Sequence, residues 1–207
     1  LLITSNTHNG NTHFDDFSDQ GNYWNQTPES YFHNGTSSYG SGFTQSSRAT
    51  WFDLQTEYTW AVWSNLASTA NNQYWMTYPN EDDYMGVNDN EQFRFTVAGV
   101  TRVTADNAFS LNEWHLFAGV FSGGSYMKTF IDGVEISNSG SGSIPADSSA
   151  LHSGYKFALM CREQTNGTTS DQIIGRSAQF GIWALTTAAN GDALLTEPML
   201  QELWEAG

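Results

Sequence analysis

The sequence is poor in cysteine and in basic residues, and both shortages limit what the protein can be. Its 207 residues include one cysteine, Cys161, and seven Lys and Arg against 22 Asp and Glu, a formal net charge of -15. A single cysteine forms neither an intrachain disulfide nor a cysteine-based zinc site. Nucleic acids and anionic lipid surfaces are bound through clustered Lys and Arg. We therefore expect neither as a partner.

Long apolar runs are also missing. No segment approaches the roughly 20 apolar residues that a transmembrane helix needs, so we expect no membrane insertion. Residues 1–6 lack the basic and apolar parts of a signal peptide. We expect a soluble chain from which any export signal has been removed. The acidic composition suits an extracellular or virion-surface location, where the surface stays hydrated, although solubility alone explains the charge equally well.

Several catalytic motifs are absent as well. The sequence has no Gly-x-Ser-x-Gly nucleophile elbow, no His-Glu-x-x-His zinc motif and no phosphate-binding loop. Residues 122–125 (Ser-Gly-Gly-Ser) are rich in glycine, but they lie between two apolar runs and are typical of a hairpin turn.

Aromatic residues are abundant, at 14% of the chain, and many alternate with the period of a β-strand. In residues 58–63 (Tyr-Thr-Trp-Ala-Val-Trp) both alternating sets are largely apolar, which predicts an inner strand covered on both faces. Alternation or apolar runs also mark further strands, which we expect at residues 93–97, 101–104, 114–121, 126–131, 134–136 and 177–185. Turns rich in Gly, Asn and Asp separate them.

This succession predicts an all-β fold, a two-sheet antiparallel jelly-roll sandwich that forms a single domain over residues 1–207. Residues 1–47 are rich in Asn, Ser and Gly but hold many aromatics, so we expect them to pack on the domain as short strands and turns. One short C-terminal helix should begin after Thr196 and place Leu200, Leu203 and Trp204 on one face. We assign four tryptophans to the core: Trp60, Trp63, Trp114 and Trp183.

Four segments resemble a known family. They are residues 58–63, the Trp-His-x-x-Ala pattern in 114–121, the Phe-Ile-Asp-Gly hairpin in 128–134, and residues 180–185 with the C-terminal helix. In this order they resemble the laminin-G-like domains of the concanavalin A-like lectin/glucanase superfamily over residues 49–207. The resemblance implies the sandwich fold. That fold carries lectins, adhesion modules, glucanases and polysaccharide lyases, so function has to be argued from a site.

Glycoside hydrolysis needs two carboxylates across the scissile bond. In glucanases of this superfamily they share one strand face in patterns such as Glu-x-Asp-x-x-Glu. Residues 81–84 (Glu-Asp-Asp-Tyr) come nearest, but they lack the second Glu and follow Pro79-Asn80, so we assign them to a loop. The Gln-x-His strand of the lyases is also missing. We predict that the protein is not an enzyme, with a glycan-cleaving enzyme of unrecognised site as the alternative.

Calcium is the one candidate cofactor. Hard cations take oxygen ligands from clustered carboxylates and carbonyls, and residues 80–91 are the segment densest in such groups. The candidate ligands are Asp82, Asp83 and Asp89. A solvated acidic loop without metal is the other interpretation of this segment.

Carbohydrate sites combine exposed rings with amides and carboxylates, and residues 71–80 have that composition. If residues 73–78 alternate as a strand, Trp75 lies on one face and Tyr78 on the other, so one ring is left toward solvent. The candidate ligand-binding residues are Trp75, Tyr78 and Tyr84 as a stacking platform and Asn80 as a polar contact. Packing of these rings inside the sandwich is the alternative.

We therefore expect a non-catalytic carbohydrate-binding or adhesion module of a secreted or virion surface protein, with a glycan or a glycosylated surface as partner. A structural module of a tail fibre or coat, with contacts to other proteins, is the second alternative. The sequence does not indicate the oligomeric state.

Overall fold

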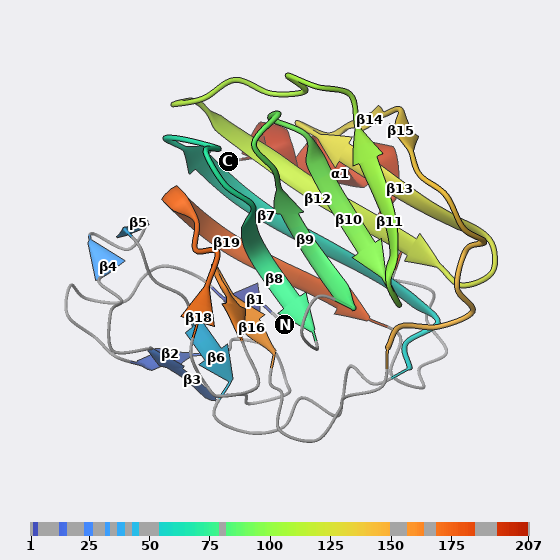
Figure 1. The fold of residues 1–207 in the computed structure, drawn as a ribbon, viewed down its shortest axis with the longest axis horizontal. Coiled ribbons are helices and arrows are strands. Elements are labelled where there is room, and N and C mark those ends of the chain that lie inside the picture. The colour runs from blue at the N-terminus through green and yellow to red at the C-terminus, as the bar shows by residue number, and fades with distance from the viewer. Residues whose placement is uncertain are drawn as a thin grey trace.

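The computed structural model describes residues 54–78, 82–149, 157–163, 169–184 and 194–206, together with the backbone of short strands before residue 46. Two antiparallel sheets pack face to face, with the strands of one drawn in front of the other in Figure 1. The predicted two-sheet sandwich with one short C-terminal helix is therefore confirmed.

The first sheet has its long strands in the centre. Its order is β14 (Val134–Ile136), β13 (Tyr126–Ile131), β12 (Trp114–Ser122), β7 (Glu57–Leu66), β19 (Ile174–Ala184), β5 (Ser37–Tyr39) and β4 (Phe32–His33), and β1 (Leu2–Ile3) also pairs with β19. We call it sheet A.

The second sheet, sheet B, covers one face of sheet A. Its order is β15 (Asn138–Ser139), β11 (Val100–Thr104), β10 (Phe93–Val97), β9 (Asp83–Val87), β8 (Gln73–Tyr78), β16 (Ala158–Leu159), β6 (Phe43–Gln45), β3 (Tyr23–Gln26) and β2 (His13–Asp15). A separate pair joins β17 (Arg162–Glu163) to β18 (Thr169–Ser170). The strands before residue 46 thus extend both sheets.

Strand β7 lies in the middle of sheet A and is covered on both faces, as its sequence predicts. Tyr58, Trp60 and Val62 belong to the main core between the sheets. Ala61, on the opposite face, belongs to a second apolar cluster that includes Leu200 of the C-terminal helix. Two apolar sets on one strand therefore correspond to two separate layers of packing.

Helix α1 (Glu197–Ala206) supplies that second layer on the outer face of sheet A, and Figure 1 draws it behind β12 and β13. The amide of Leu200 donates to the carbonyl of Thr196, which places Thr196 at the expected helix start. Pro198 lies in the first turn, where its missing N–H is harmless. In the part of the chain that the structure describes, no helix is long and apolar enough to cross a lipid bilayer.

Strand β8 departs from simple alternation. Its pairing with β9 shifts register between Tyr74 and Met76, and Trp75, Met76 and Tyr78 all belong to the main core. The prediction that Trp75 and Tyr78 lie on opposite faces is therefore wrong, because a bulge adds a residue and turns the following side chains over. Residues 83 and 84 also lie in a strand, β9, and not in the loop that we expected.

Candidate functional site

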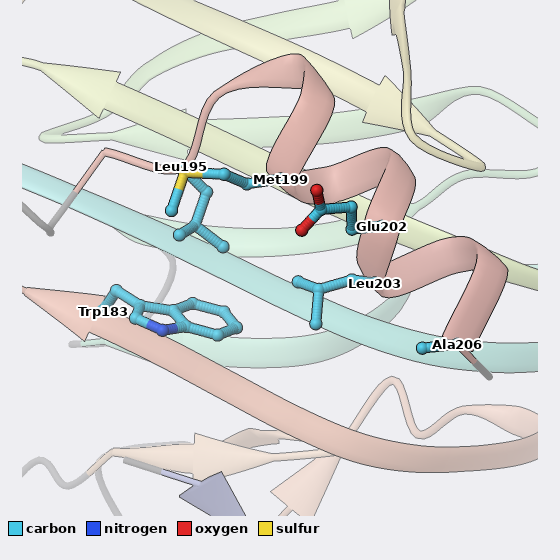
Figure 2. A pocket seen from close by; sticks show the side chains of 6 residues that line it. All are labelled: Trp183, Leu195, Met199, Glu202, Leu203 and Ala206. Atoms are coloured by element: carbon cyan, nitrogen blue, oxygen red, sulfur yellow. The ribbon is translucent and has the colours of Figure 1, made fainter.

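A cleft of about 400 Å³ lies between strand β19 and helix α1, on the outer face of sheet A. Its size falls in the range of small-molecule sites, roughly 300–1,000 Å³. It is lined by Trp183, Leu195, Met199, Glu202, Leu203 and Ala206. Figure 2 shows these side chains in the space between the strand and the helix.

Trp183 forms the strand side of the cleft, and two features of β19 set its position. A register shift between Ala178 and Gly181 re-aims the strand, so that Phe180 and Ile182 enter the main core while Trp183 faces the helix. The indole ring lies over Gly181, where a Cβ would clash with Cζ3 of the ring at 2.5 Å. The missing side chain of Gly181 therefore lets the ring lie down along the sheet.

Helix α1 forms the other side of the cleft. Met199, Leu203 and Ala206 are four and three residues apart, so they share one helix face. Met199 is 42% exposed and Leu203 is 37% exposed, which leaves apolar surface open at the cleft. Glu202 is exposed and is the one charged side chain among the described lining residues. The result is an aromatic ring faced by aliphatic side chains and a carboxylate.

A neighbouring face of α1 holds the helix on the sheet. Leu200 is fully buried, and the ring of Trp204 stacks on that of Trp63 from β7, with centroids 4.7 Å apart and an interplanar angle of 18°. Just before the helix, the amide of Leu195 donates to the hydroxyl of buried Thr59 at 3.0 Å. Thr59 pairs with Trp183 across the strands, so this hydrogen bond fixes Leu195 beside the ring.

The β13–β14 hairpin supports the helix from the other side. Asp132 and Gly133 have φ of 54° and 79°, the left-handed pair that tight hairpin turns require and that an Asp-Gly sequence favours. A Cβ on Gly133 would be 2.5 Å from Cα of Gln201, so the turn touches the helix backbone. Glycine is required here both for the turn and for this close approach.

The stacking platform predicted from the sequence is not at the surface. Trp75 and Tyr78 have no exposed area, and Tyr84 is 4% exposed. Trp75 packs on Phe117 with ring centroids 4.3 Å apart, and Tyr84 packs edge-on against Tyr74 at 5.0 Å. The prediction of these three rings as sugar contacts is wrong, because the sandwich buries them. Asn80 lies outside the described residues.

The three predicted calcium ligands do not come together. Asp82 and Asp83 lie at one end of β9 and Asp89 follows its other end, about 20 Å away at the rise of an extended strand. Asp89 is exposed, whereas Asp83 is fully buried. No group of three or more His, Cys, Asp or Glu among the described side chains is placed to hold a metal ion. Calcium binding elsewhere in the chain stays a prediction.

Asp83 instead ties two loops to the core. Its carboxylate accepts hydrogen bonds from the amides of Ser149, at 2.9 Å, and Ala98, at 3.1 Å. The hydroxyl of Tyr58 lies 3.5 Å away. Burial raises the pKa of Asp83 to about 7, although the two amides oppose the rise. Since burial penalises the charged form, this carboxyl group takes up a proton far more easily than an exposed one.

Ser110, His115 and Asp132 form a chain that resembles a hydrolytic triad. Asp132 lies 2.8 Å from Nδ1 of His115, and Oγ of Ser110 lies 3.0 Å from Nε2. The Ser110 hydroxyl, however, donates to Glu113. When the His115 ring is protonated, Nδ1 donates to Asp132 and Nε2 donates to Ser110. A nucleophilic serine needs the opposite direction, with the imidazole as acceptor. The chain links the loop before β12 to the β13–β14 turn.

Sequence reasoning missed the cleft because it assigned Trp183 to the core. Of the four tryptophans placed there, Trp60 is fully buried, and the other three, Trp63, Trp114 and Trp183, are partly exposed. One signal pointed to the true arrangement. Gly181 lies two residues before Trp183, on the same face of the strand, and glycine inside a strand marks a close approach.

Residues 34–171 match the model of the concanavalin A-like lectin/glucanases superfamily. No curated protein matches the chain. Among solved structures, the binding domain of botulinum neurotoxin serotype D aligns with a TM-score of 0.66 at 10% identity, over 100% of this chain and 51% of that one. The chain therefore spans about half the length of that domain.

Two further solved structures contain sugars. The ligand-binding domain of botulinum neurotoxin serotype D in complex with N-acetylneuraminic acid aligns with a TM-score of 0.65 at 9% identity, over 100% of this chain and 50% of that one. Domain 4 of AbnA, a GH43 extracellular arabinanase from Geobacillus stearothermophilus, in complex with arabinotriose, aligns with a TM-score of 0.55 at 12% identity, over 98% and 86%. At these identities the likeness establishes the fold alone. With a family model that matches most of its length and two sheets in the expected arrangement, the chain belongs to the concanavalin A-like lectin/glucanases superfamily.

Proposed function

We propose that this chain is a non-catalytic carbohydrate-binding module and that the cleft between β19 and α1 is its binding site. The observation that carries the proposal is the position of Trp183, whose ring lies along the sheet over Gly181 and faces an open cleft. Sugars place their C–H faces on such rings, because these faces are apolar while the hydroxyl groups remain available for hydrogen bonds.

Glu202 supplies the polar part of the proposed site. A carboxylate accepts hydrogen bonds from sugar hydroxyls, and a few well-placed polar groups in an otherwise apolar pocket are what orient a small ligand. Figure 2 shows Glu202 on the side of α1 that faces the cleft, between Met199 and Leu203. The Trp183 ring thus matches the C–H face of a sugar, and the Glu202 carboxylate matches its hydroxyl groups.

The same lining supports a binding role over hydrolysis. Glycosidases need two carboxyl groups about 5–9.5 Å apart, and among the described residues that line this cleft Glu202 is the one acidic side chain. A glycan-cleaving activity elsewhere in the chain remains the alternative, and release of reducing ends from mixed polysaccharides tests it directly.

The relatives are consistent with this role. Two of the solved structures were determined with sugars, and one belongs to an enzyme described as extracellular. We propose that the chain likewise acts outside a cell or on a virion surface. A structural module that contacts protein is the second candidate, favoured by the apolar area left exposed at Met199 and Leu203.

Glycan binding by Trp183→Ala tests the proposal. A glycan array followed by calorimetry on the best ligand should show binding by the wild type and at least ten-fold weaker binding by the variant, because the stacking face is lost. Trp114→Ala is the matched control, since Trp114 is also a partly exposed tryptophan of sheet A but lies outside the cleft. Binding retained by Trp183→Ala would remove the cleft from the site. No glycan binding, with a stable oligomer in light scattering, would favour the structural module.

A further inference from the structure

The helix that forms one side of the cleft is acidic. The sequence of α1 contains Glu197, Glu202 and Glu205 and no Lys or Arg. Of the three, Glu202 lines the cleft, and none of the lining residues that the structure describes is basic. An anionic ligand would therefore meet negative charge, and no cation, in the part of the lining that the structure describes.

Lys128, the basic residue of the neighbouring β13–β14 hairpin, already forms an ion pair. Nζ of Lys128 lies 2.7 Å from a carboxylate oxygen of Glu135, and the amide of Glu135 in turn donates to Glu197 at 3.4 Å. Lys128 thus forms an ion pair with Glu135 inside the hairpin, and it does not line the cleft. Proteins bind carboxylate, sulfate and phosphate groups through Arg, Lys or clustered amides, and no described side chain of the lining is Arg or Lys.

We propose, on the basis of the function proposed above, that the cleft selects neutral glycans and excludes sugars that carry carboxylate or sulfate groups. A neutral sugar offers hydroxyl donors to the acceptor-only carboxylate of Glu202 and a C–H face to Trp183. An acidic sugar in the same position would bring a second negative charge next to Glu202, at a separation shorter than the Debye length, so the two charges would repel each other. The cleft therefore takes neutral sugars although a solved domain of the same fold holds N-acetylneuraminic acid.

The test uses matched pairs of glycans on one array, in which each neutral oligosaccharide is printed beside its sialylated, sulfated or uronic acid counterpart. We expect the wild type to bind the neutral member of a pair at least ten-fold more tightly when the acidic group is on the sugar that stacks on Trp183. Raising the salt concentration from about 0.05 to 1 M should narrow this difference, because the Debye length shortens.

Variants separate charge from shape. Glu202→Gln keeps a side chain of the same size and removes the charge. The logarithm of the ratio between the affinities for the neutral and the acidic glycan of a pair should therefore fall to half of the wild-type value or less. Glu205→Gln is the matched control. Glu205 is exposed on the same helix and accepts from Gln201 at 3.4 Å, but it does not line the cleft. It should leave the discrimination within two-fold of the wild type.

The outcomes distinguish this inference from the function on which it rests. Equal or tighter binding of acidic glycans, abolished by Trp183→Ala, would overturn the selectivity and leave the binding role intact. Binding of neither class would overturn both. Self-association that Leu203→Ala abolishes, without any glycan bound, would instead assign the cleft to a second copy of the chain.

Discussion

Gly181 controls the position of the ring that faces the cleft. A methyl group at residue 181 would collide with the far end of the Trp183 ring, which can move aside, and not with backbone, which cannot. The substitution Gly181→Ala should therefore tilt the ring away from the sheet at small cost in stability. We expect a melting temperature within a few degrees of the wild type and a several-fold weaker glycan affinity, measured by calorimetry. Unchanged affinity would mean that the flat ring is not the binding surface.

Asp83 gives stability a dependence on pH. Burial raises its pKa in the folded protein to about 7, from 3.8 for the free group. The folded state then holds this proton more tightly than the unfolded state between about pH 4 and 7, so the free energy of unfolding falls as the pH rises through that window. The slope from one group is at most about 1.4 kcal/mol per pH unit.

Asp83→Asn removes this titration. Denaturant unfolding measured from pH 4 to 8 should show a flatter profile for the variant than for the wild type. The cost of the substitution should be largest near pH 4, because an amide has one acceptor oxygen for the two backbone amides that Asp83 binds. It should shrink as the pH rises through 7, because only the wild type then carries a buried charge. Asp82→Asn, at the neighbouring half-buried residue, is the control and should keep the wild-type slope. Parallel profiles for all three proteins would contradict the raised pKa.

At the scale of elements, helix α1 is attached through specific contacts as well as apolar burial. The hydroxyl of Thr59 accepts the amide of Leu195 in a buried environment. Thr59→Val keeps the shape but leaves that amide without its acceptor, which costs about 1–3 kcal/mol. We expect lower stability in urea unfolding and faster amide exchange in residues 195–206. Thr56→Val, at an exposed residue just before β7, should change neither. An unaltered exchange pattern in Thr59→Val would show that burial alone holds the helix.

The β13–β14 turn is joined to β12 through His115. The hydrogen bond to Asp132 raises the pKa of His115 above 6.5, so the stability that this pair contributes is complete below pH 6.5 and is lost as the pH rises through the folded-state pKa. Asp132→Asn removes the carboxylate charge beside His115. An NMR titration should therefore find a lower pKa for His115 in this variant than in the wild type. Glu135→Gln, a substitution in the same hairpin at a residue that does not contact His115, should leave it unchanged. A pKa that stays raised in Asp132→Asn would assign the effect to Glu113.

Some elements of the fold could be predicted from the sequence and others could not. Strand β7, the turn at Asp132 and Gly133 and helix α1 follow from local patterns, because alternation, turn chemistry and capping act over a few residues. The bulge in β8 leaves no local signature in the sequence. This bulge places Trp75 and Tyr78 together in the core, so the prediction that they form an exposed stacking platform is wrong. The cleft joins β19 to α1 through tertiary packing, and periodicity does not report packing between elements.

At the scale of the whole molecule, the cleft exists only while α1 is docked, since its two sides come from separate elements. A bound glycan should therefore raise the melting temperature of the entire sandwich. Ligand at 100 times its Kd adds about 2.7 kcal/mol to the free energy of unfolding. Thermal unfolding with and without the glycan checks this, with Trp183→Ala as the variant that should not respond. An equal shift in that variant would place the ligand elsewhere.

The turn at Gly133 carries a wider consequence. Because the turn touches the helix backbone at Gln201 and also holds Asp132 against His115, it is shared between the proton-binding histidine and the wall of the cleft. On the proposed function, the protonation of His115 and the affinity of the cleft for its ligand are linked through one hairpin. Because the raised pKa of His115 favours the protonated ring in the folded state, a more acidic medium should stabilise the hairpin against which α1 packs.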